Sequence, residues 1–164
     1  MIQKDLKNAR ILIVDDLQTN IDILTELLAM DGYLNIETTT NPREVLDRTK
    51  SFDPDLILLD LMMPYLSGFD VMDLLTVEKQ KSLNPTKYLP ILVLTADASQ
   101  DVRLKALAAG AKDFLSKPFD LLEVRLRIKN LLETQYLFQL MTEKQLTLEE
   151  KVITFLKISD EWYR

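Results

Sequence analysis

Five residues whose side chains can do chemistry stand directly after short apolar runs of the chain. They are Asp15, Asp16, Asp60, Thr95 and Lys117. Each has an ordinary explanation alone, because aspartate caps helices, threonine suits strands and lysine is solvated at strand ends. In an open α/β sheet, however, ligands bind outside the carboxyl ends of the strands. If the apolar runs are parallel strands of one sheet, all five side chains lie along one edge of it. Such a grouping is much less expected by chance than any one of these residues alone.

The three carboxylates and the ammonium group predict a site for a hard cation and a phosphoryl group. Two like charges about 4 Å apart repel by about 4 kcal/mol at an effective dielectric constant of about 20, so the carboxylates need a cation, a proton or Lys117. The chain has no histidine and no cysteine, and oxygen ligands select Mg²⁺, with Mn²⁺ as the alternative. A carboxylate beside Mg²⁺ can attack phosphorus to give an aspartyl phosphate. A hydroxyl and an ammonium group then balance the charge of the phosphoryl group.

Three unbroken apolar runs predict strands that are buried on both faces, as in the centre of a parallel sheet. They cover residues 11–14, 56–59 and 91–94, and weaker strand patterns cover 35–39 and 113–116. Helical spacing of apolar residues separates these runs, so strand and helix alternate five times. This alternation predicts an α/β fold, a flavodoxin-like, doubly wound sheet of five parallel strands in the order 2-1-3-4-5.

The helices between the strands are predicted from their apolar spacing and their terminal residues. Asn41 before Pro42 predicts one helix start, and Asp120 with Glu123 resembles a capping box that opens the last helix. Residues 80–88 are polar and predict a loop. The residues expected on the inward faces of three helices are Ile21, Leu24, Leu27, Leu28, Val71, Leu74, Leu75, Val102, Leu104 and Leu107.

The stretch from residue 121 to residue 164 contains no proline or glycine and predicts one long helix. A heptad seam can be traced along it, and seven of its ten positions are apolar, which favours a coiled coil. We expect residues 121–132 to be the last helix of a domain that covers residues 8–132. Residues 133–164 are expected to form a coiled-coil linker that makes a homodimer. The seam positions are Leu131, Thr134, Phe138, Met141, Gln145, Leu148, Val152, Phe155, Ser159 and Trp162.

The composition excludes several classes of protein. With 164 residues, 47% of them hydrophobic, the chain can form one domain with a core and an appendage. A net charge of −6 argues against direct binding of nucleic acid. The lack of cysteine excludes disulfides and cysteine-based zinc sites. No apolar run approaches the roughly 18 residues of a membrane span, so we expect a cytoplasmic protein without membrane contact.

The chemistry-bearing residues and their neighbours resemble the receiver domain of two-component response regulators over residues 8–132. Receiver domains share the flavodoxin-like fold and accept a phosphoryl group on an aspartate. The joint match of several separated motifs makes the resemblance specific. The motifs that carry it are Asp15-Asp16, Asp60 with Met63-Pro64 and Gly68, Thr95-Ala96, and Lys117-Pro118-Phe119.

The resemblance implies a phosphoacceptor and a metal site. Asp60 would accept the phosphoryl group. Asp16 and Asp60 would bind Mg²⁺ directly and Asp15 would bind it through water. The main-chain carbonyl of Met62 would be a further ligand of the metal.

The resemblance also implies residues that sense the phosphoryl group. Thr95 would hydrogen-bond to a phosphoryl oxygen, and Lys117 would pair with the phosphate. The Lys117-Pro118 bond is expected to be cis. Phe114 stands where the family often has a rotating aromatic residue, commonly tyrosine, and a phenylalanine offers no hydroxyl to that switch.

The resemblance implies partners as well. Because the chain has no histidine, the donor must be a separate sensor histidine kinase, a histidine phosphotransfer protein or a small phosphodonor. The protein would catalyse only its own phosphorylation and pass the signal through its last helix. Residues 127–134 resemble linkers that precede cyclic-di-GMP phosphodiesterase outputs, so we expect part of a longer regulator. The alternative is a receiver-like interaction or dimerisation module that is never phosphorylated.

Overall fold

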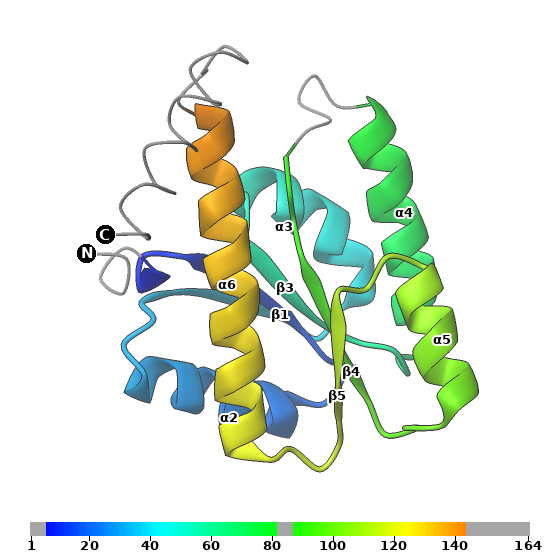
Figure 1. Ribbon diagram of the computed structural model, residues 1–164. Helices are drawn as coiled ribbons and strands as arrows, with labels where there is room; N and C mark the ends of the chain where they lie inside the picture. The colour runs from blue at the N-terminus through cyan, green and yellow to red at the C-terminus, as the bar shows by residue number, and fades with distance from the viewer. Residues whose placement is uncertain (1–5, 82–86, 144–164) are drawn as a thin grey trace, which may run out of the picture.

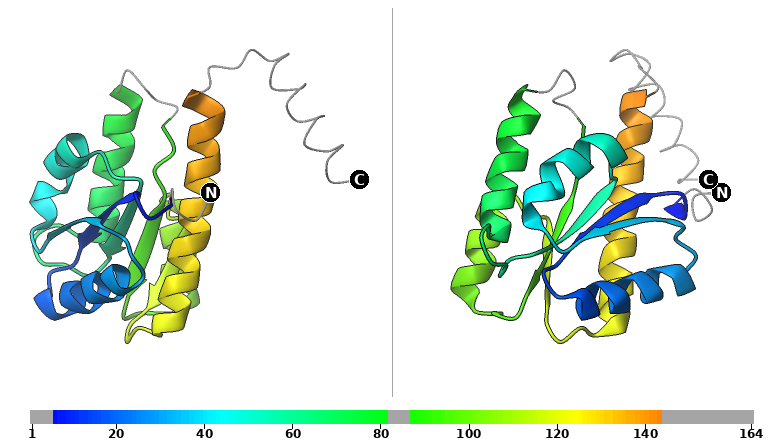
Figure 2. Two further views of the ribbon diagram at one scale, coloured as in Figure 1. Left: turned by 90° about the vertical axis from the view of Figure 1, so that its left-hand side faces the viewer. Right: turned by 180° about the vertical axis from the view of Figure 1, so that it is seen from behind.

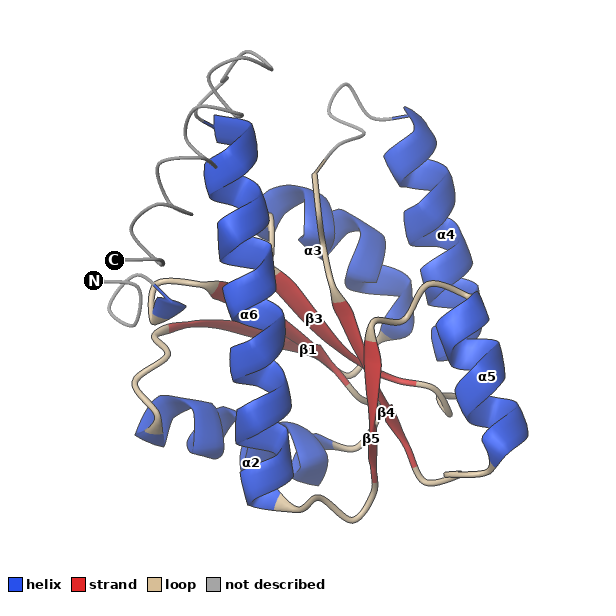
Figure 3. Cartoon of the chain, viewed as in Figure 1, coloured by secondary structure: helices blue, strands red, loops and turns tan. Residues whose placement is uncertain are grey.

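Five parallel strands form the centre of the protein, in a computed structural model that describes residues 6–81 and 87–143. The order is β2-β1-β3-β4-β5, as predicted, so β1 and β3 are neighbours (Figure 1). Figure 3 shows the helices that alternate with these strands along the chain. The strands are β1 (Arg10–Val14), β2 (Asn35–Thr39), β3 (Leu56–Asp60), β4 (Ile91–Thr95) and β5 (Asp113–Ser116).

Two hydrophobic cores lie on opposite faces of the sheet, and alternate residues of the central strands point into each. In β3, Leu56 and Leu58 belong to one core, whereas Ile57 and Leu59 belong to the other. Helices α2 (Gln18–Met30) and α6 (Leu121–Glu143) cover the first core. Helices α3 (Val45–Phe52), α4 (Gly68–Lys81) and α5 (Gln100–Ala108) cover the second (Figure 2). Burial on both faces explains why these strands are continuous apolar runs.

The helix starts agree with the predicted caps in most respects. The side chain of Asn41 accepts a hydrogen bond from the Arg43 N–H at 3.1 Å, at the head of a short 3-10 helix, η1 (Pro42–Glu44), that leads into α3. At the start of α6, Asp120 Oδ1 accepts from the N–H groups of Leu122 and Glu123 at 2.9 and 3.1 Å. The Glu123 side chain pairs with Arg127 at 2.7 Å, so its carboxylate is engaged along the helix.

Three of the leucines predicted to face inward are exposed instead. Leu104, Leu107 and Leu74 have 56%, 44% and 45% of their surface accessible. On α5 the inward face is made by Val102, Ala106 and Ala109, which follow the i, i+4, i+7 spacing of one helix face. The prediction chose the leucines because they are the largest apolar residues of the helix. Small residues face inward instead, because they allow α5 to pack close to the sheet. Of the predicted loop at residues 80–88, Gln80 and Lys81 belong to α4 instead, and residues 82–86 lie outside the described residues.

Helix α6 keeps contact with the domain along most of its described length. Its buried residues include Val124, Ile128 and Leu132, each 0% exposed, and the contacts continue beyond residue 132. Of the seam positions, Leu131 packs against the first core and Phe138 contacts Tyr88, with ring centroids 5.3 Å apart. The prediction that packing on the domain stops at residue 132 is therefore wrong. Apolar residues that recur at the heptad spacing, such as Phe138, contact the domain beyond that residue.

Phe138 is 42% exposed despite its contact with Tyr88, and the other two described seam positions are exposed as well. Thr134 is exposed, and Met141 has 59% of its surface accessible. The remaining six seam positions lie outside the described residues, so the coiled coil stays a prediction. No helix within residues 6–81 and 87–143 is long and apolar enough to cross a membrane.

Candidate functional site

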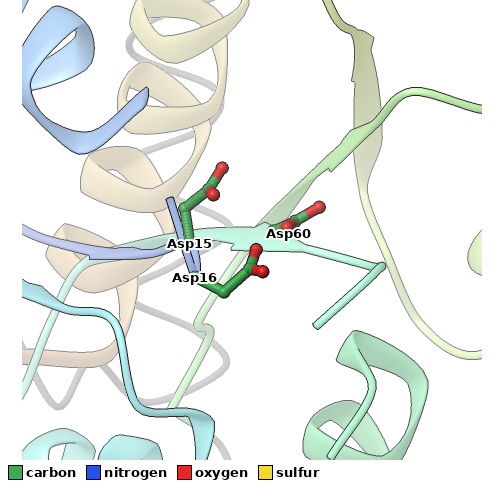
Figure 4. A group of neighbouring side chains, drawn as sticks. All are labelled: Asp15, Asp16 and Asp60. Atoms are coloured by element: carbon green, nitrogen blue, oxygen red, sulfur yellow. The ribbon is translucent and has the colours of Figure 1, made fainter. Parts of the chain in front are cut away.

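The carboxylates predicted to meet do meet, at the carboxyl edge of β1 and β3. Strands β1 and β3 run parallel in register, with Val14 opposite Leu59. Asp60 ends β3, and Asp15 and Asp16 follow β1 directly. Oxygen atoms of all three side chains lie within 4.8 Å of one another (Figure 4). Three oxygen donors so close fit a hard divalent cation such as Mg²⁺.

Asp15 is fixed in this cluster by its own loop. The side chain is completely buried, and its Oδ1 accepts from the Leu17 N–H at 2.9 Å. The Asn20 side-chain amide donates to both oxygens of Asp15, at 3.2 and 3.1 Å. Sequence reasoning missed Asn20, although an amide one turn into the helix after an acidic pair is a recognisable signal. These bonds hold Asp15 in place without neutralising its charge.

Lys117 brings the balancing positive charge from β5. Its Nζ lies 2.7 Å from Asp15 Oδ2 and 3.2 Å from Asp60 Oδ1. The main-chain N–H of Lys117 donates to the carbonyl of Thr95 at 2.8 Å, so the ends of β4 and β5 are tied together. The Lys117-Pro118 peptide bond is cis, as predicted. The residue predicted to pair with a phosphate thus lies against the carboxylates.

Burial raises the pKa of Asp60 from 3.8 to about 6. The negative charge of Asp15 and the neighbouring Asp16 also raise this pKa, while the Lys117 ammonium opposes the rise. The site therefore resists holding three negative charges, and a divalent cation would relieve that resistance.

Thr95 completes the edge from β4. It is 1% exposed, and its Oγ1 donates to the Asp97 carbonyl and accepts from the Asp97 N–H, both at 3.0 Å. The hydroxyl is thus engaged with its own loop. All five residues singled out at the strand ends therefore belong to one edge, which holds three carboxylates, a hydroxyl and an ammonium group.

The family model described as response regulator receiver domain matches residues 11–129. The chain belongs to this family. The transcriptional regulatory protein YvrH of Bacillus subtilis is 36% identical over 131 residues, covering 80% of this chain and 52% of YvrH. The response regulator MprA of Mycolicibacterium vanbaalenii is 42% identical over 124 residues, covering 75% of this chain and 50% of MprA. The chain thus spans about half the length of these relatives.

A solved structure supports the same assignment of fold. The chemotaxis protein CheY4 of Vibrio cholerae superposes with a TM-score of 0.67 at 28% identity, over 76% of this chain and 98% of that chain. The likeness covers nearly all of that protein. This agrees with a receiver domain to which further residues are joined.

Phe114, the candidate switch residue, lies on β5 between two guanidinium groups. The Arg103 guanidinium is 4.3 Å from the ring centroid and that of Arg127 is 5.8 Å away. Arg127 is itself held by Asp113, with Nη1 2.7 and 2.6 Å from the two carboxylate oxygens. The ring is half-buried and is held by cation–π contacts rather than by a hydroxyl group.

The loop after Asp60 approaches the site with its backbone. The Met62 N–H donates to Asp60 Oδ1 at 3.3 Å, while the Met62 side chain is 69% exposed. Gly68 begins α4 directly beneath this loop, and its N–H donates to the Leu61 carbonyl at 3.0 Å. A Cβ on Gly68 would lie 2.4 Å from the Asp60 carbonyl oxygen. The closeness of these two backbones explains the glycine.

Proposed function

We propose that the protein is a phosphoacceptor receiver that takes a phosphoryl group on Asp60. The observation that carries the proposal is the joint placement of three carboxylates and Lys117 at one sheet edge. The donor is a phosphohistidine of a sensor histidine kinase or a histidine phosphotransfer protein, because the chain has no histidine of its own.

In the proposed reaction an Asp60 oxygen attacks phosphorus and forms a P–O bond. The P–N bond to the donor imidazole breaks, and the imidazole nitrogen keeps the electron pair and takes up a proton. Asp60 and Asp16 would hold Mg²⁺ directly, Asp15 through water, and the Met62 main-chain carbonyl would add a ligand. The bound cation would withdraw charge from the phosphoryl oxygens.

The remaining residues would stabilise and sense the product. Lys117 would move its ammonium group from the free carboxylate to the phosphoryl oxygens, which carry more charge. Thr95 would exchange its bonds to Asp97 for one to a phosphoryl oxygen, and Phe114 would respond by packing alone. The protein would process no substrate other than its own phosphoryl group.

The signal is proposed to leave through α6 toward an output domain or a partner protein. The name of YvrH states transcriptional regulation for that relative, and here an output of this kind is a proposal. A cyclic-di-GMP phosphodiesterase output rests only on the likeness of residues 127–134. We also propose homodimerisation through the C-terminal helix, supported by the exposed apolar residues Leu137 and Met141.

Labelling with phosphoramidate, followed by intact mass spectrometry, tests the phosphoacceptor. The wild type should gain one phosphate only when Mg²⁺ is present, and Asp60→Asn should gain none. Asp70→Asn is the matched control, because Asp70 is exposed and bonds to Ser67 outside the cluster. Labelling of the Asp60→Asn variant would contradict the assignment. Absence of labelling in the wild type would favour the unphosphorylated interaction module.

A further inference from the structure

The second half of α6 is held by the amino-terminal end of the sheet, opposite the phosphoacceptor edge. Gln135 is only 5% exposed, and its Nε2 donates to Asp55 Oδ1 at 3.3 Å. Asp55 is 8% exposed and immediately precedes β3. The two residues are 80 positions apart in the chain. A buried amide thus joins the output helix to the strand that carries Asp60.

Asp55 is a prepared acceptor for this bond. Its backbone N–H donates to the Arg10 carbonyl at 2.7 Å, and its Oδ2 accepts from the Arg10 N–H at 2.8 Å. The carboxylate is therefore locked to β1, with Oδ1 turned to Gln135. A buried acceptor that loses its donor is costly, so the position favours keeping Gln135 in place.

An aromatic contact lies next to Gln135 on the same helix. The Phe138 and Tyr88 ring centroids are 5.3 Å apart, and the Lys112 Nζ lies 5.6 Å from the Tyr88 centroid. Toward the start of the helix, Leu131 packs against the core shared with β1 and β3. We call the Gln135–Asp55 and Phe138–Tyr88 contacts together the α6 clamp.

Leu131 and Phe138 are seven residues apart and hold the same position of the predicted heptad seam. Both contact the domain of their own chain, with Leu131 half-buried and Phe138 42% exposed, whereas the seam residue Met141 and its neighbour Leu137 have 59% and 54% of their surface accessible. A coiled coil needs its seam residues to pack into a partner helix. The clamp and a dimer that uses this seam therefore exclude each other.

We propose that the receiver covers one side of its own dimerisation seam, at Leu131 and Phe138, with the α6 clamp as an autoinhibitory contact that must open before the coiled coil forms. This inference rests on the proposed dimerisation through the C-terminal helix. The partner that displaces the clamp is α6 of a second copy of this chain. Apparent affinity falls with the fraction of competent molecules, and a symmetric dimer needs both protomers open. A change that opens the clamp therefore strengthens dimerisation through both protomers, and its effect on the dimerisation constant is squared.

Gln135→Glu in the full chain tests the clamp. It places a carboxylate against the Asp55 carboxylate and leaves every seam residue unchanged. The Arg10 side chain does not neutralise the pair fully, since its Nη2 is 3.1 Å from Asp53 and its Nε 3.8 Å from Asp55. Asn130→Asp is the matched control, because it adds the same charge to an exposed position of α6.

Sedimentation equilibrium of the unphosphorylated proteins is the measurement. Gln135→Glu should tighten dimerisation by at least about tenfold, and Asn130→Asp should leave it near the wild-type value. Tyr88→Ala removes the domain side of the aromatic contact, keeps Phe138, and should shift the equilibrium in the same direction. Hydrogen exchange should show lower protection of residues 131–143 in monomeric Gln135→Glu.

Unchanged or weaker dimerisation in both clamp variants would overturn the proposal. So would a wild-type dimer in which the protection of residues 131–143 matches that of the monomer. Phosphoramidate labelling of the same samples separates the two proposals. Normal labelling at Asp60 with unchanged dimerisation removes only the clamp, whereas absent labelling with tighter dimerisation removes only the phosphoacceptor.

Discussion

Replacing Asp60 with asparagine is expected to stabilise the metal-free protein. The folded state raises the pKa of Asp60 from 3.8 to about 6, mainly because the carboxyl group is buried. Ionised Asp60 is therefore less favourable in the folded protein than in the unfolded chain. An asparagine removes this charge, while Lys117 keeps its contact with Asp15 at 2.7 Å.

The size of the effect follows from the pKa. A rise from 3.8 to about 6 corresponds to about 3 kcal/mol of lost stability when the group is fully ionised. Asparagine also loses the contact between Lys117 and Asp60, so we expect a gain in the free energy of unfolding of about 1 to 3 kcal/mol at pH 7.5. For a protein of this size that is about 3 to 9 °C in Tm.

The pH dependence has a definite sign. Because the folded-state pKa of Asp60 is raised, Asp60 does not lower the free energy of unfolding below its unfolded pKa of 3.8. The free energy of unfolding then falls as the pH rises through about 6, where Asp60 ionises in the folded protein. The advantage of Asp60→Asn should therefore shrink by about half between pH 7.5 and pH 5. Urea unfolding at both pH values, with chelator present, measures it.

Two comparisons make the assay specific. Asp70 accepts bonds from Ser67 and its pKa is lowered, so Asp70→Asn should destabilise rather than stabilise. Added Mg²⁺ should stabilise the wild type more than Asp60→Asn and narrow the gap between them. An Asp60→Asn variant no more stable than the wild type in chelator, or an advantage that is the same at both pH values, would refute the electrostatic account.

Three further changes have expected outcomes from local geometry. Gly68→Ala should destabilise by about 1 to 3 kcal/mol because its Cβ would lie 2.4 Å from the Asp60 carbonyl oxygen; chemical denaturation measures this, and wild-type stability would contradict it. Asp120→Ala should cost about 1 kcal/mol by removing the cap of α6, seen as earlier hydrogen exchange in the first helical turn. Lys117→Ala should lower Tm more in chelator than in Mg²⁺, since it leaves the carboxylates without their cation; equal losses in both buffers would argue against the charge balance.

The sheet and the site edge could be predicted because strong, local signals determine them. Apolar runs buried on both faces identify the central strands, and parallel topology brings their carboxyl ends together whatever the helices do. The sequence predicts Asp15, Asp16 and Asp60 at one edge of the sheet, and there their oxygen atoms lie within 4.8 Å of one another. The caps at Asn41 and Asp120 are equally local, because each side chain bonds to backbone two or three residues away.

What could not be predicted depends on packing or on contacts between distant residues. Leu104 and Leu107 fit a helical spacing, yet Ala106 is the buried residue of α5, because closeness to the sheet favours a small side chain. The Gln135–Asp55 bond could not be predicted, because the spacing of residues around Gln135 or Asp55 does not indicate that the two side chains meet. A polar residue on a helix is expected to face solvent, and only the tertiary structure shows that Gln135 is buried.

Strand β3 also limits how such a sequence can diverge. Residues 56–59 have no exposed surface and point alternately into the two cores, so no position among them offers a face where a polar replacement is harmless. Edge strand β2, with Asn35 exposed and Thr39 buried, has more freedom. In an evolutionary series, the middle of β3 should therefore exchange only one aliphatic residue for another. Polar side chains occur at the two ends of this segment, Asp55 before it and Asp60 after it, so we expect changes there to alter function before they alter the fold.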